Sequence, residues 1–419
     1  MHLCLFEDDG LDHLWPLAAS RAVYDLRLGL RTLLDTTREA FPSANGTLLH
    51  SRDALGPVTA RENDLLTNRI PGNLDVLFVN GRFVAEDGPA LERLRAAAAA
   101  NDEAARVFTS DGDVVAAWMP EADPDLLDAN ALTRTTFGDL PEEELPEARL
   151  VGRLWHLLDG LEAALRRDYA ARASGYNILQ RPEARVHEAA TLTEPERIVT
   201  AKGCTVRPGA VLDATEGPIY LAENTLVEEG AVVRGPCCVG PQSVIKAHAV
   251  IEDSAFGYYC KMGGEVERTV VHSLSNKAHP GFLGDSYVGR WCNFGADSNN
   301  SNLKNDYGDV TLYDRAEGDF VDTERQFMGL VMGDHSKCGI NTMFNTGTVV
   351  GVFCNLFGGG FMPRHVPDFS WGGTEKRMRY RTDKALRVAE TVMARRDREL
   401  SDAGRDLLRA IADRRETAR

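Results

Sequence analysis

Apolar residues recur every six positions through the middle of this chain. Four residues after each of them comes a small side chain. An α-helix repeats near 3.6 residues and a half-buried strand near two, so neither element explains a period of six. The spacing predicts a parallel β-helix of hexapeptide turns, in which each coil buries its apolar residues by stacking on its neighbours. The apolar set is Leu221, Val227, Val233, Val239, Ile245 and Ile251, and the small set is Thr225, Ala231, Cys237, Ser243, Ala249 and Ala255.

The period is interrupted and then returns. It resumes at Met332, Cys338, Phe344, Val350 and Leu356, and Val288 and Phe294 keep it locally, whereas residues 297–331 do not. That segment is rich in Asn, Asp and Gly, so we expect a loop or hairpin projecting from the coil. Insertions in a solenoid tend to gather on one binding face. The interruption therefore indicates where a functional site is to be sought.

The sequence on either side of the repeats predicts two further units. Residues 1–180 alternate short apolar runs (3–10, 74–84) with helical patterns (24–41, 90–108), which predicts an α/β, Rossmann-like domain with a parallel sheet. We place the β-helix at 181–365. Residues 366–419 form a helical extension with Ser401 as a helix cap, and we expect this extension to cover the open end of the coil.

Composition limits the classes of partner. The net charge of −16 argues against binding to nucleic acid or to an anionic membrane, and no run of eighteen apolar residues is present to span a bilayer. The acidic start, MHLCLFEDDG, lacks the features of a signal peptide. The eight cysteines show neither CxxC pairs nor zinc spacing, so we expect buried thiols and a cytoplasmic location.

The most informative motif is the segment NKAHPGFLGDSYVGRWCNFGADSNNSNLKND, residues 276–306. It resembles the acetyltransferase half of the bifunctional enzymes that make UDP-N-acetylglucosamine. In that family Lys-Ala-Gly-His is followed by Leu-Gly-Asp, then Asn-Ile-Gly-Ala-Gly, then an Asn in a polar loop. His279 lies six residues before Asp285, as the catalytic histidine of the family does. The resemblance implies a left-handed β-helix.

Chemistry supports a catalytic role for His279. An amine that attacks a thioester must lose a proton, and an imidazole is suited to take it, while backbone amides near Asn293 and Ala296 can stabilise the oxyanion. The resemblance implies an acetyl-CoA site at Gly295, Ala296 and Ile340. It implies substrate contacts from Lys277, Phe282, Glu265, Asn293, Asn302 and Lys304.

Two positions depart from the family pattern. Phe282 stands where the family has a sugar-contacting tyrosine, so the ring is kept and the hydroxyl is lost. Glu265, Val266 and Glu267 stand where the family has a lysine after Glu-Met. A sugar phosphate would therefore need another cation, and Arg268, Lys277 and Lys304 are the candidates.

The N-terminal segment LFEDDGLDHLWPLAASRAVYDLRLGLRTLL resembles a divergent group of sugar nucleotidyltransferases fused to hexapeptide helices. Their usual Gly-rich loop is absent, so Arg21 and Arg27, with Arg31, are expected to bind the triphosphate. Asp8, Asp9 and Asn80 follow predicted strands and are candidate ligands for Mg²⁺.

Together these features predict an enzyme of nucleotide-sugar synthesis. It would transfer a nucleotidyl group from a nucleoside triphosphate to a sugar-1-phosphate and acetylate an amino-sugar phosphate from acetyl-CoA, as a homotrimer by resemblance. In one alternative the β-helix is only an oligomerisation or regulatory module. In another it is a hydratase of the γ-carbonic anhydrase type with zinc between subunits, although the histidine pair five residues apart that this requires is missing.

Overall fold

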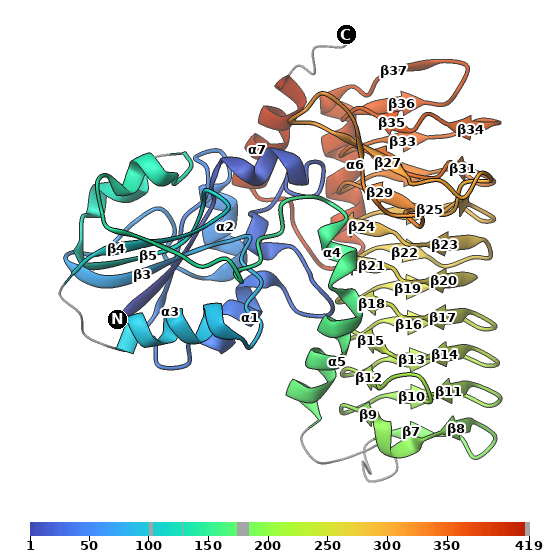
Figure 1. Cartoon of the computed structure of the whole chain (residues 1–419). Helices are drawn as coiled ribbons and strands as arrows, with labels where there is room; N and C mark the ends of the chain where they lie inside the picture. The colour runs from blue at the N-terminus through green and yellow to red at the C-terminus, as the bar shows by residue number, and fades with distance from the viewer. Residues whose placement is uncertain (100–103, 129, 174–183, 415–419) are drawn as a thin grey trace.

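The computed structural model describes residues 1–99, 104–128, 130–173 and 184–414, and shows an α/β domain beside a tall β-helix (Figure 1). The boundary expected near residue 180 lies outside the described residues. Among the described residues, no helix combines the length and the apolar character needed to cross a bilayer.

The N-terminal domain is built on one six-stranded sheet in the order β2-β1-β3-β5-β4-β6. The expectation of a wholly parallel sheet was wrong. Strand β5 runs antiparallel to both β3 and β4, because Asp111 and Gly112 adopt positive φ and close a tight β4–β5 hairpin. The elements are β1 (His2–Phe6), α1 (Leu33–Ala40), β2 (Thr47–Leu49), α2 (Gly56–Asn63), β3 (Leu74–Asn80), α3 (Pro89–Ala99), β4 (Arg106–Ser110), β5 (Asp113–Ala122) and β6 (Glu142–Glu144).

The helix expected over 24–41 begins only at Leu33. Thr32 and Asp35 form a capping box that starts α1 there, since each side chain accepts from the other residue's backbone N–H. The preceding residues form compact turns, with one short 3-10 helix at Val23–Asp25. These turns carry Arg21 and Arg27 and lead the chain to the β-helix.

The predicted β-helix is confirmed, and each coil supplies one strand to each of three faces. The first face contains β7 (Arg185–Val186), β10 (Thr205–Val206), β13 (Leu226–Val227), β16 (Val244–Ile245), β19 (Lys261–Met262), β22 (Asn276–Lys277), β25 (Asn293–Phe294), β30 (Lys337–Cys338), β33 (Asn355–Leu356), β36 (Ser370–Gly372) and the antiparallel β37 (Arg377–Arg379). The second contains β8 (Thr191–Thr193), β11 (Val211–Asp213), β14 (Val232–Arg234), β17 (Val250–Glu252), β20 (Glu265–Glu267) and β23 (Phe282–Gly284), followed by a separate sheet of β26 (Asn299–Asn300), β31 (Met343–Phe344) and β34 (Phe361–Met362). The third contains β9 (Ile198–Thr200), β12 (Ile219–Leu221), β15 (Cys237–Val239), β18 (Ala255–Phe256), β21 (Val270–Ser273), β24 (Tyr287–Arg290), β29 (Leu330–Met332), β32 (Thr348–Val350) and β35 (His365–Val366).

The interior of the coil is the one that the period of six predicts. Val227, Val233 and Ile245 are fully buried, and the second run from Met332 to Leu356 joins the same core. All eight cysteines are buried free thiols, as expected. Strand β36 extends the coil beyond the boundary that we placed at 365.

The insertion is confirmed as a hairpin. The chain leaves the coil after β26, forms the antiparallel pair β27 (Thr311–Asp314) and β28 (Asp319–Asp322), and returns at β29. Asp314 accepts from His13 and pairs with Arg153. The hairpin is thereby held against the N-terminal domain.

The third face is covered, whereas the second lies farthest from the N-terminal domain (Figure 1). The N-terminal domain and helices α4 (His156–Asp159) and α5 (Leu161–Arg172) pack on the third face, with Leu161 and Leu165 in one core with Cys238. The corner between the first two faces is left uncovered by that domain.

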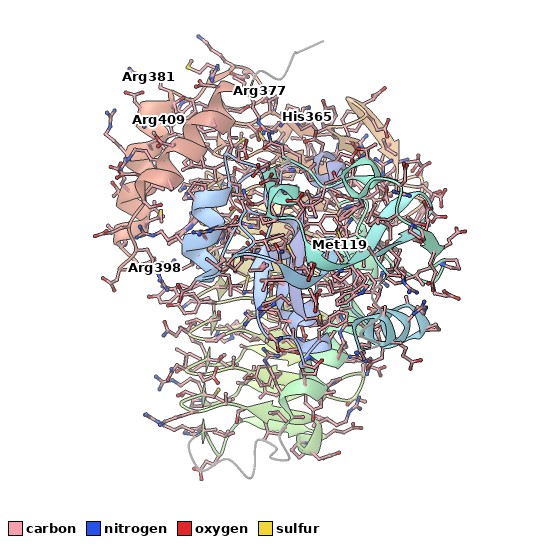
Figure 2. All side chains as sticks on the ribbon, turned by 90° about the vertical axis from the view of Figure 1, so that its left-hand side faces the viewer. Met119, His365, Arg377, Arg381, Arg398 and Arg409 are labelled. Carbon is pink, nitrogen blue, oxygen red and sulfur yellow. The ribbon has the colours of Figure 1, made fainter. Side chains whose placement is uncertain are left out.

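The C-terminal helices α6 (Thr382–Ala394) and α7 (Asp402–Asp413) are confirmed, and Ser401 caps α7. The expectation that they close the end of the coil was wrong. They pack along its side, where Leu386 and Leu407 share a core with Phe353 of the coil and Val58 of α2. Figure 2 shows Arg381, Arg398 and Arg409 around these helices, all exposed.

Candidate functional site

The candidate catalytic histidine lies at a turn that we call the first corner, which joins the first face to the second in each coil. In three consecutive coils this corner comprises residues 278–281, 295–298 and 339–342. Backbone hydrogen bonds connect them: Asp297 N donates to Pro280 O (3.1 Å) and Asn341 N to Ala296 O (2.8 Å). His279 is exposed, and Ile340 is 71% exposed. The structure thus brings His279, Gly295, Ala296 and Ile340 to one open edge.

The backbone N–H groups expected to stabilise the oxyanion differ in whether they already donate a hydrogen bond within the coil. Asn293 N donates to Ser336 O at 3.2 Å and Gly295 N to Cys338 O at 3.0 Å, so both amides are committed to the coil. Within the described part of the chain, the Ala296 N–H has no hydrogen-bond partner. Ala296 therefore offers a free backbone donor, and the His279 and Ile340 N–H groups of this corner are likewise without a partner among the described residues.

Three predicted substrate contacts flank the corner. Glu265 and Phe282 are register partners on neighbouring strands of the second face, where Glu265 is exposed and Phe282 is partly exposed. Asn293 is exposed on the first face, and its Oδ1 lies 3.5 Å from Nδ2 of Asn276. His279 stands at the turn between these two groups.

The ladder of the second face is broken beside this site. Between β23 and β26, two asparagine side chains replace the strand-to-strand bonds: Asn299 Oδ1 accepts from Phe282 N (2.8 Å) and Asn300 Oδ1 from Gly284 N (2.9 Å). Asn300 also donates to Gly284 O at 3.0 Å. The break is why β26 begins a separate sheet, and it gives the Asn-rich segment a structural role.

At the C-terminal ends of strands β20 and β23 of the second face, acidic side chains pair with Arg268. Arg268 pairs with Asp285 (2.8 Å) and Glu267 (2.8 Å), while Asn302 Nδ2 donates to Asp285 (2.7 Å) and Glu267 (3.1 Å). Burial raises the pKa of the Glu267 carboxyl despite the nearby Arg268. A cavity of about 410 Å³ opens here, lined in part by Asp253 and Phe327. A phosphate-binding role expected of Arg268 does not fit this pairing.

The two candidate lysines do not lie as expected of phosphate ligands. Lys304 is in the insertion, where its ammonium donates to Asp309 O (3.1 Å) and pairs with Asp306. Lys277 is only 2% exposed and points into the coil, so a direct substrate contact from it is contradicted. Its side chain replaces an apolar residue in the interior column.

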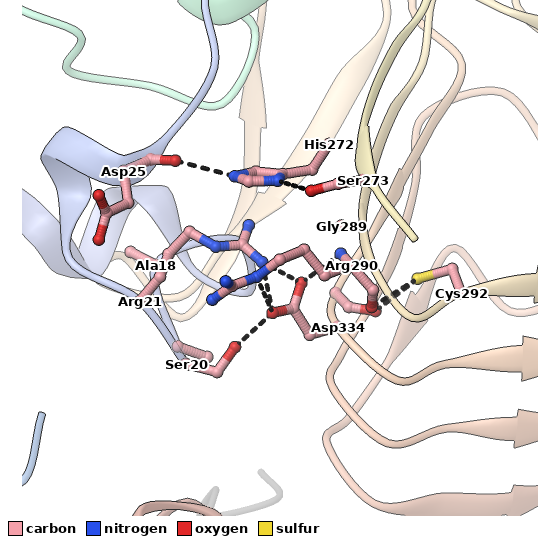
Figure 3. Close-up of polar contacts among 12 residues, drawn as sticks. Ala18, Ser20, Arg21, Asp25, His272, Ser273, Gly289, Arg290, Cys292 and Asp334 are labelled. Carbon is pink, nitrogen blue, oxygen red and sulfur yellow. Dashed lines mark hydrogen bonds and ion pairs between the residues drawn. The ribbon is translucent and has the colours of Figure 1, made fainter. Parts of the chain in front are cut away.

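Arg21 and Arg27 face the β-helix, not an open pocket. Figure 3 shows Arg21 beside Asp334, whose carboxylate also accepts from Ser20 Oγ (2.6 Å) and from Arg290 N (2.7 Å). Burial would raise the pKa of Asp334, but Arg21 and Arg290 outweigh it and lower the pKa. Arg27 donates from Nε to His272 O at 2.8 Å. The predicted role of these arginines in triphosphate binding does not fit, because Arg21 is buried and Arg27 is partly buried at the domain interface.

The predicted magnesium ligands also do not fit a cation in this arrangement. Asp8 is buried, and both of its carboxylate oxygens accept from the Arg82 guanidinium (2.9 Å from Nε to Oδ1). Asn80 Nδ2 donates to Asp8 at 2.8 Å, so its amide presents hydrogens to the carboxylate. Asp9 is exposed on the following turn. A guanidinium already holds the position that a divalent cation would take.

Sequence reasoning missed Asp334 and Arg82. Each acts on a residue that is distant in the chain, since Arg21 is separated from Asp334 by 313 positions and Asp8 from Arg82 by 74. No local pattern links such pairs. A cavity of about 900 Å³ between α2, the coil and the C-terminal helices could not be predicted from local patterns either. It is lined in part by Asp25, Glu62, Arg290 and Ser401.

The chain is similar to known proteins in sequence and, in part, to solved structures. Residues 3–177 match the family described as sugar nucleotidyl transferase. A bifunctional protein GlmU from Methanocaldococcus jannaschii is 28% identical over 151 residues, which cover 33% of this chain and 36% of that protein. A bifunctional sugar-1-phosphate nucleotidylyltransferase/acetyltransferase from Sulfurisphaera tokodaii is 24% identical over 159 residues, covering 36% and 38%.

Among solved structures, a UDP-N-acetylglucosamine acyltransferase from Arabidopsis aligns over 52% of this chain and 79% of its own, with 15% identity and a TM-score of 0.23. The chain spans about a third of the length of the curated relatives it matches. The sequence matches confirm the resemblance to bifunctional nucleotidyltransferase/acetyltransferase proteins.

Proposed function

Because this chain resembles bifunctional sugar nucleotidyltransferase/acetyltransferases, we propose that its β-helix transfers an acetyl group from acetyl-CoA to the amine of an amino-sugar phosphate. The observation that carries the proposal is the first corner. There an exposed imidazole, His279, lies one coil away from the free Ala296 N–H and two coils from the exposed Ile340.

His279 acts as general base in this reaction. The amine nitrogen attacks the thioester carbonyl carbon while the imidazole takes the proton that the amine loses. The Ala296 N–H donates to the oxygen as negative charge develops on it. The carbon–sulfur bond then breaks, and the imidazolium returns the proton to the thiolate, which leaves as free coenzyme A.

The flanking residues suit the two substrates. Ile340 gives acetyl-CoA an apolar contact beside Gly295 and Ala296. Phe282 offers a ring face to the sugar, and the exposed Glu265 carboxylate beside it can accept hydrogen bonds from the sugar hydroxyls or the amine. The corner is open on one chain, and we propose that a second subunit of a homotrimer completes the acetyl-CoA site.

A second activity is favoured by the family match over residues 3–177. We propose that the N-terminal domain handles a nucleoside triphosphate and a sugar-1-phosphate, with nucleotidyl transfer and release of pyrophosphate. Formation of pyrophosphate from each nucleoside triphosphate with glucosamine-1-phosphate or its N-acetyl form tests this activity, and its absence with all of them would refute it.

The acetyl transfer is tested by thiol release from acetyl-CoA with glucosamine-1-phosphate. We expect His279→Ala to lower kcat/KM by about 10²–10⁴-fold. His248→Ala is the matched control, because His248 is also exposed and lies at the same corner two coils away. Absence of release from the wild type with any amino-sugar phosphate, or equal activity of both variants, would refute the proposal.

A further inference from the structure

One interior column of the β-helix contains a single charged side chain. Register partners on the first face align one inward residue per coil, and from β7 to β33 these residues are apolar in every coil except that of His279. The exception is Lys277, which lies between Met262 below and Phe294 above. The column is Val186, Val206, Val227, Ile245, Met262, Lys277, Phe294, Cys338 and Leu356.

A shortened corner makes room for the Lys277 ammonium. In the coil of Lys277, the inward residues that flank the first corner are Lys277 and Leu283, six positions apart. In the coil below, they are Met262 and Val266, only four positions apart. The short turn there is Gly263 and Gly264. Gly264 has φ +75°, and a Cβ on it would lie 3.0 Å from Lys277 Nζ and 2.4 Å from Gly281 O. Glycine is therefore required where the ammonium and the next turn approach.

Three backbone carbonyls converge on this ammonium. Lys277 Nζ donates to His279 O (2.8 Å), to Gly263 O (3.1 Å) and to Pro280 O (3.3 Å). Two of them belong to the turn that carries the imidazole. Within the described part of the chain, the His279 ring has no hydrogen-bond partner of its own, so the backbone of this turn sets where the ring stands.

We propose that Lys277 is a positioning residue of the acetyl-transfer site: from inside the coil, its ammonium fixes the first-corner turn that presents His279, without touching substrate. This inference rests on the proposed function. Charge-assisted hydrogen bonds to carbonyls are stronger than neutral ones, so one ammonium can hold the turn at three points. Burial lowers the pKa of Lys277 to about 8, with Cys338 and Asp297 acting weakly in the opposite direction. The charge therefore costs stability, which an apolar residue at this position would not.

The test compares Lys277→Met, Lys277→Gln and the control Lys261→Met. Methionine occupies the same column at Met262, and glutamine keeps an N–H donor without the charge. Lys261 is exposed on β19, one coil below. Each full-length variant is assayed for kcat and KM with acetyl-CoA and glucosamine-1-phosphate, and backbone hydrogen exchange is measured over residues 278–281.

We expect Lys277→Met to lower kcat about ten-fold or more, to leave both KM values within two-fold, and to speed exchange at 278–281 about ten-fold while other coils stay unchanged. Lys277→Gln should fall between it and the wild type, and Lys261→Met should match the wild type. If Lys277→Met does not fold, kcat, KM and hydrogen exchange of Lys277→Gln test the proposal in its place.

Three results would overturn the proposal. One is wild-type kcat and exchange in both Lys277 variants, and another is exchange that rises equally in all coils. The third is a higher sugar KM with unchanged kcat, which would show direct substrate contact. If the wild type transfers no acetyl group, the proposed function fails, while the exchange measurement still decides whether Lys277 fixes the corner.

Discussion

The third face and the first corner belong to the same coils but treat charge in opposite ways. Against the third face, Arg21 and Asp334 are buried and Arg290 is partly buried, and both guanidiniums pair with the single Asp334 carboxylate across the domain interface. At the first corner, His279 is exposed and without a partner among the described residues. Side chains that bind each other hold a fold together, whereas side chains without internal partners are available to a substrate.

The same contrast separates the two domains. The sheet edge of the N-terminal domain, where ligands collect in open α/β sheets, is occupied by the Asp8–Arg82 pair. The first corner of the β-helix offers a free amide at Ala296 and an exposed apolar side chain at Ile340. This difference is why the proposed acetyl transfer has support from geometry as well as from the sequence matches, whereas the proposed nucleotidyl transfer rests on the family match alone.

The largest effect is expected from Asp334→Ala, because it leaves two guanidiniums in the domain interface without their shared carboxylate. We expect a loss of about 3–5 kcal/mol in the free energy of unfolding, measured by urea denaturation. Asp297→Ala at the exposed first corner should lower it by no more than about 1 kcal/mol, because Asp297 has a positive φ that alanine adopts less readily. An equal loss of unfolding free energy in the two variants would contradict the difference between the buried third face and the exposed first corner.

The pH dependence of stability gives the next prediction. Burial lowers the pKa of Lys277 from 10.5 to about 8, so between these values the unfolded chain binds more protons than the folded one. The contribution of Lys277 to stability therefore rises with pH across that window and is a constant cost below it. From pH 7.5 to 10.5, we expect the wild type to gain on the order of 2 kcal/mol relative to Lys277→Met. A parallel pH dependence in the two proteins would contradict the burial of a charged amine.

The sheet edge can be tested with Asp8→Asn. If Asp8 serves Arg82, the variant loses about 2 kcal/mol in the free energy of unfolding, to the same extent in EDTA and in MgCl₂. If Asp8 instead binds magnesium, the loss will appear only in MgCl₂. The second pattern would restore Asp8 as a metal ligand and the sheet edge as an open site.

The smallest change in stability is expected from Ile340→Asp. Ile340 is 71% exposed, so its substitution should alter the free energy of unfolding by less than about 0.5 kcal/mol. The KM for acetyl-CoA should nevertheless rise several-fold, because a carboxylate would stand where we place an apolar contact. An unchanged KM would remove Ile340 from the acetyl-CoA site.

The β-helix could be predicted because its information is local and repeated. Every inward position from Leu221 to Ile251 obeys the same spacing, and the interruption after Asn300 fell where the period failed. The antiparallel direction of β5 could not be predicted from a repeated local pattern of this kind. Its direction depends on a two-residue turn, Asp111–Gly112, in a region that otherwise reads as alternating strands and helices.

The candidate site was predicted unevenly for a similar reason. His279, Gly295, Ala296 and Ile340 meet at one corner because their coils stack in register, with the hairpin insertion projecting from the coil between Ala296 and Ile340. Arg21 and Asp8 were misplaced because their partners, Asp334 and Arg82, come from distant parts of the chain. Lys277 was misread because a lysine in a motif suggests a ligand contact, and only the inward register of β22 shows otherwise.

Hydrogen exchange with and without acetyl-CoA can show whether the first corner is the acetyl-transfer site. We expect slower exchange in the presence of acetyl-CoA at residues 278–281, 295–298 and 339–342, with the N-terminal domain unchanged. Protection confined to the N-terminal domain or to the third face, with the first corner exchanging at its free rate, would contradict it.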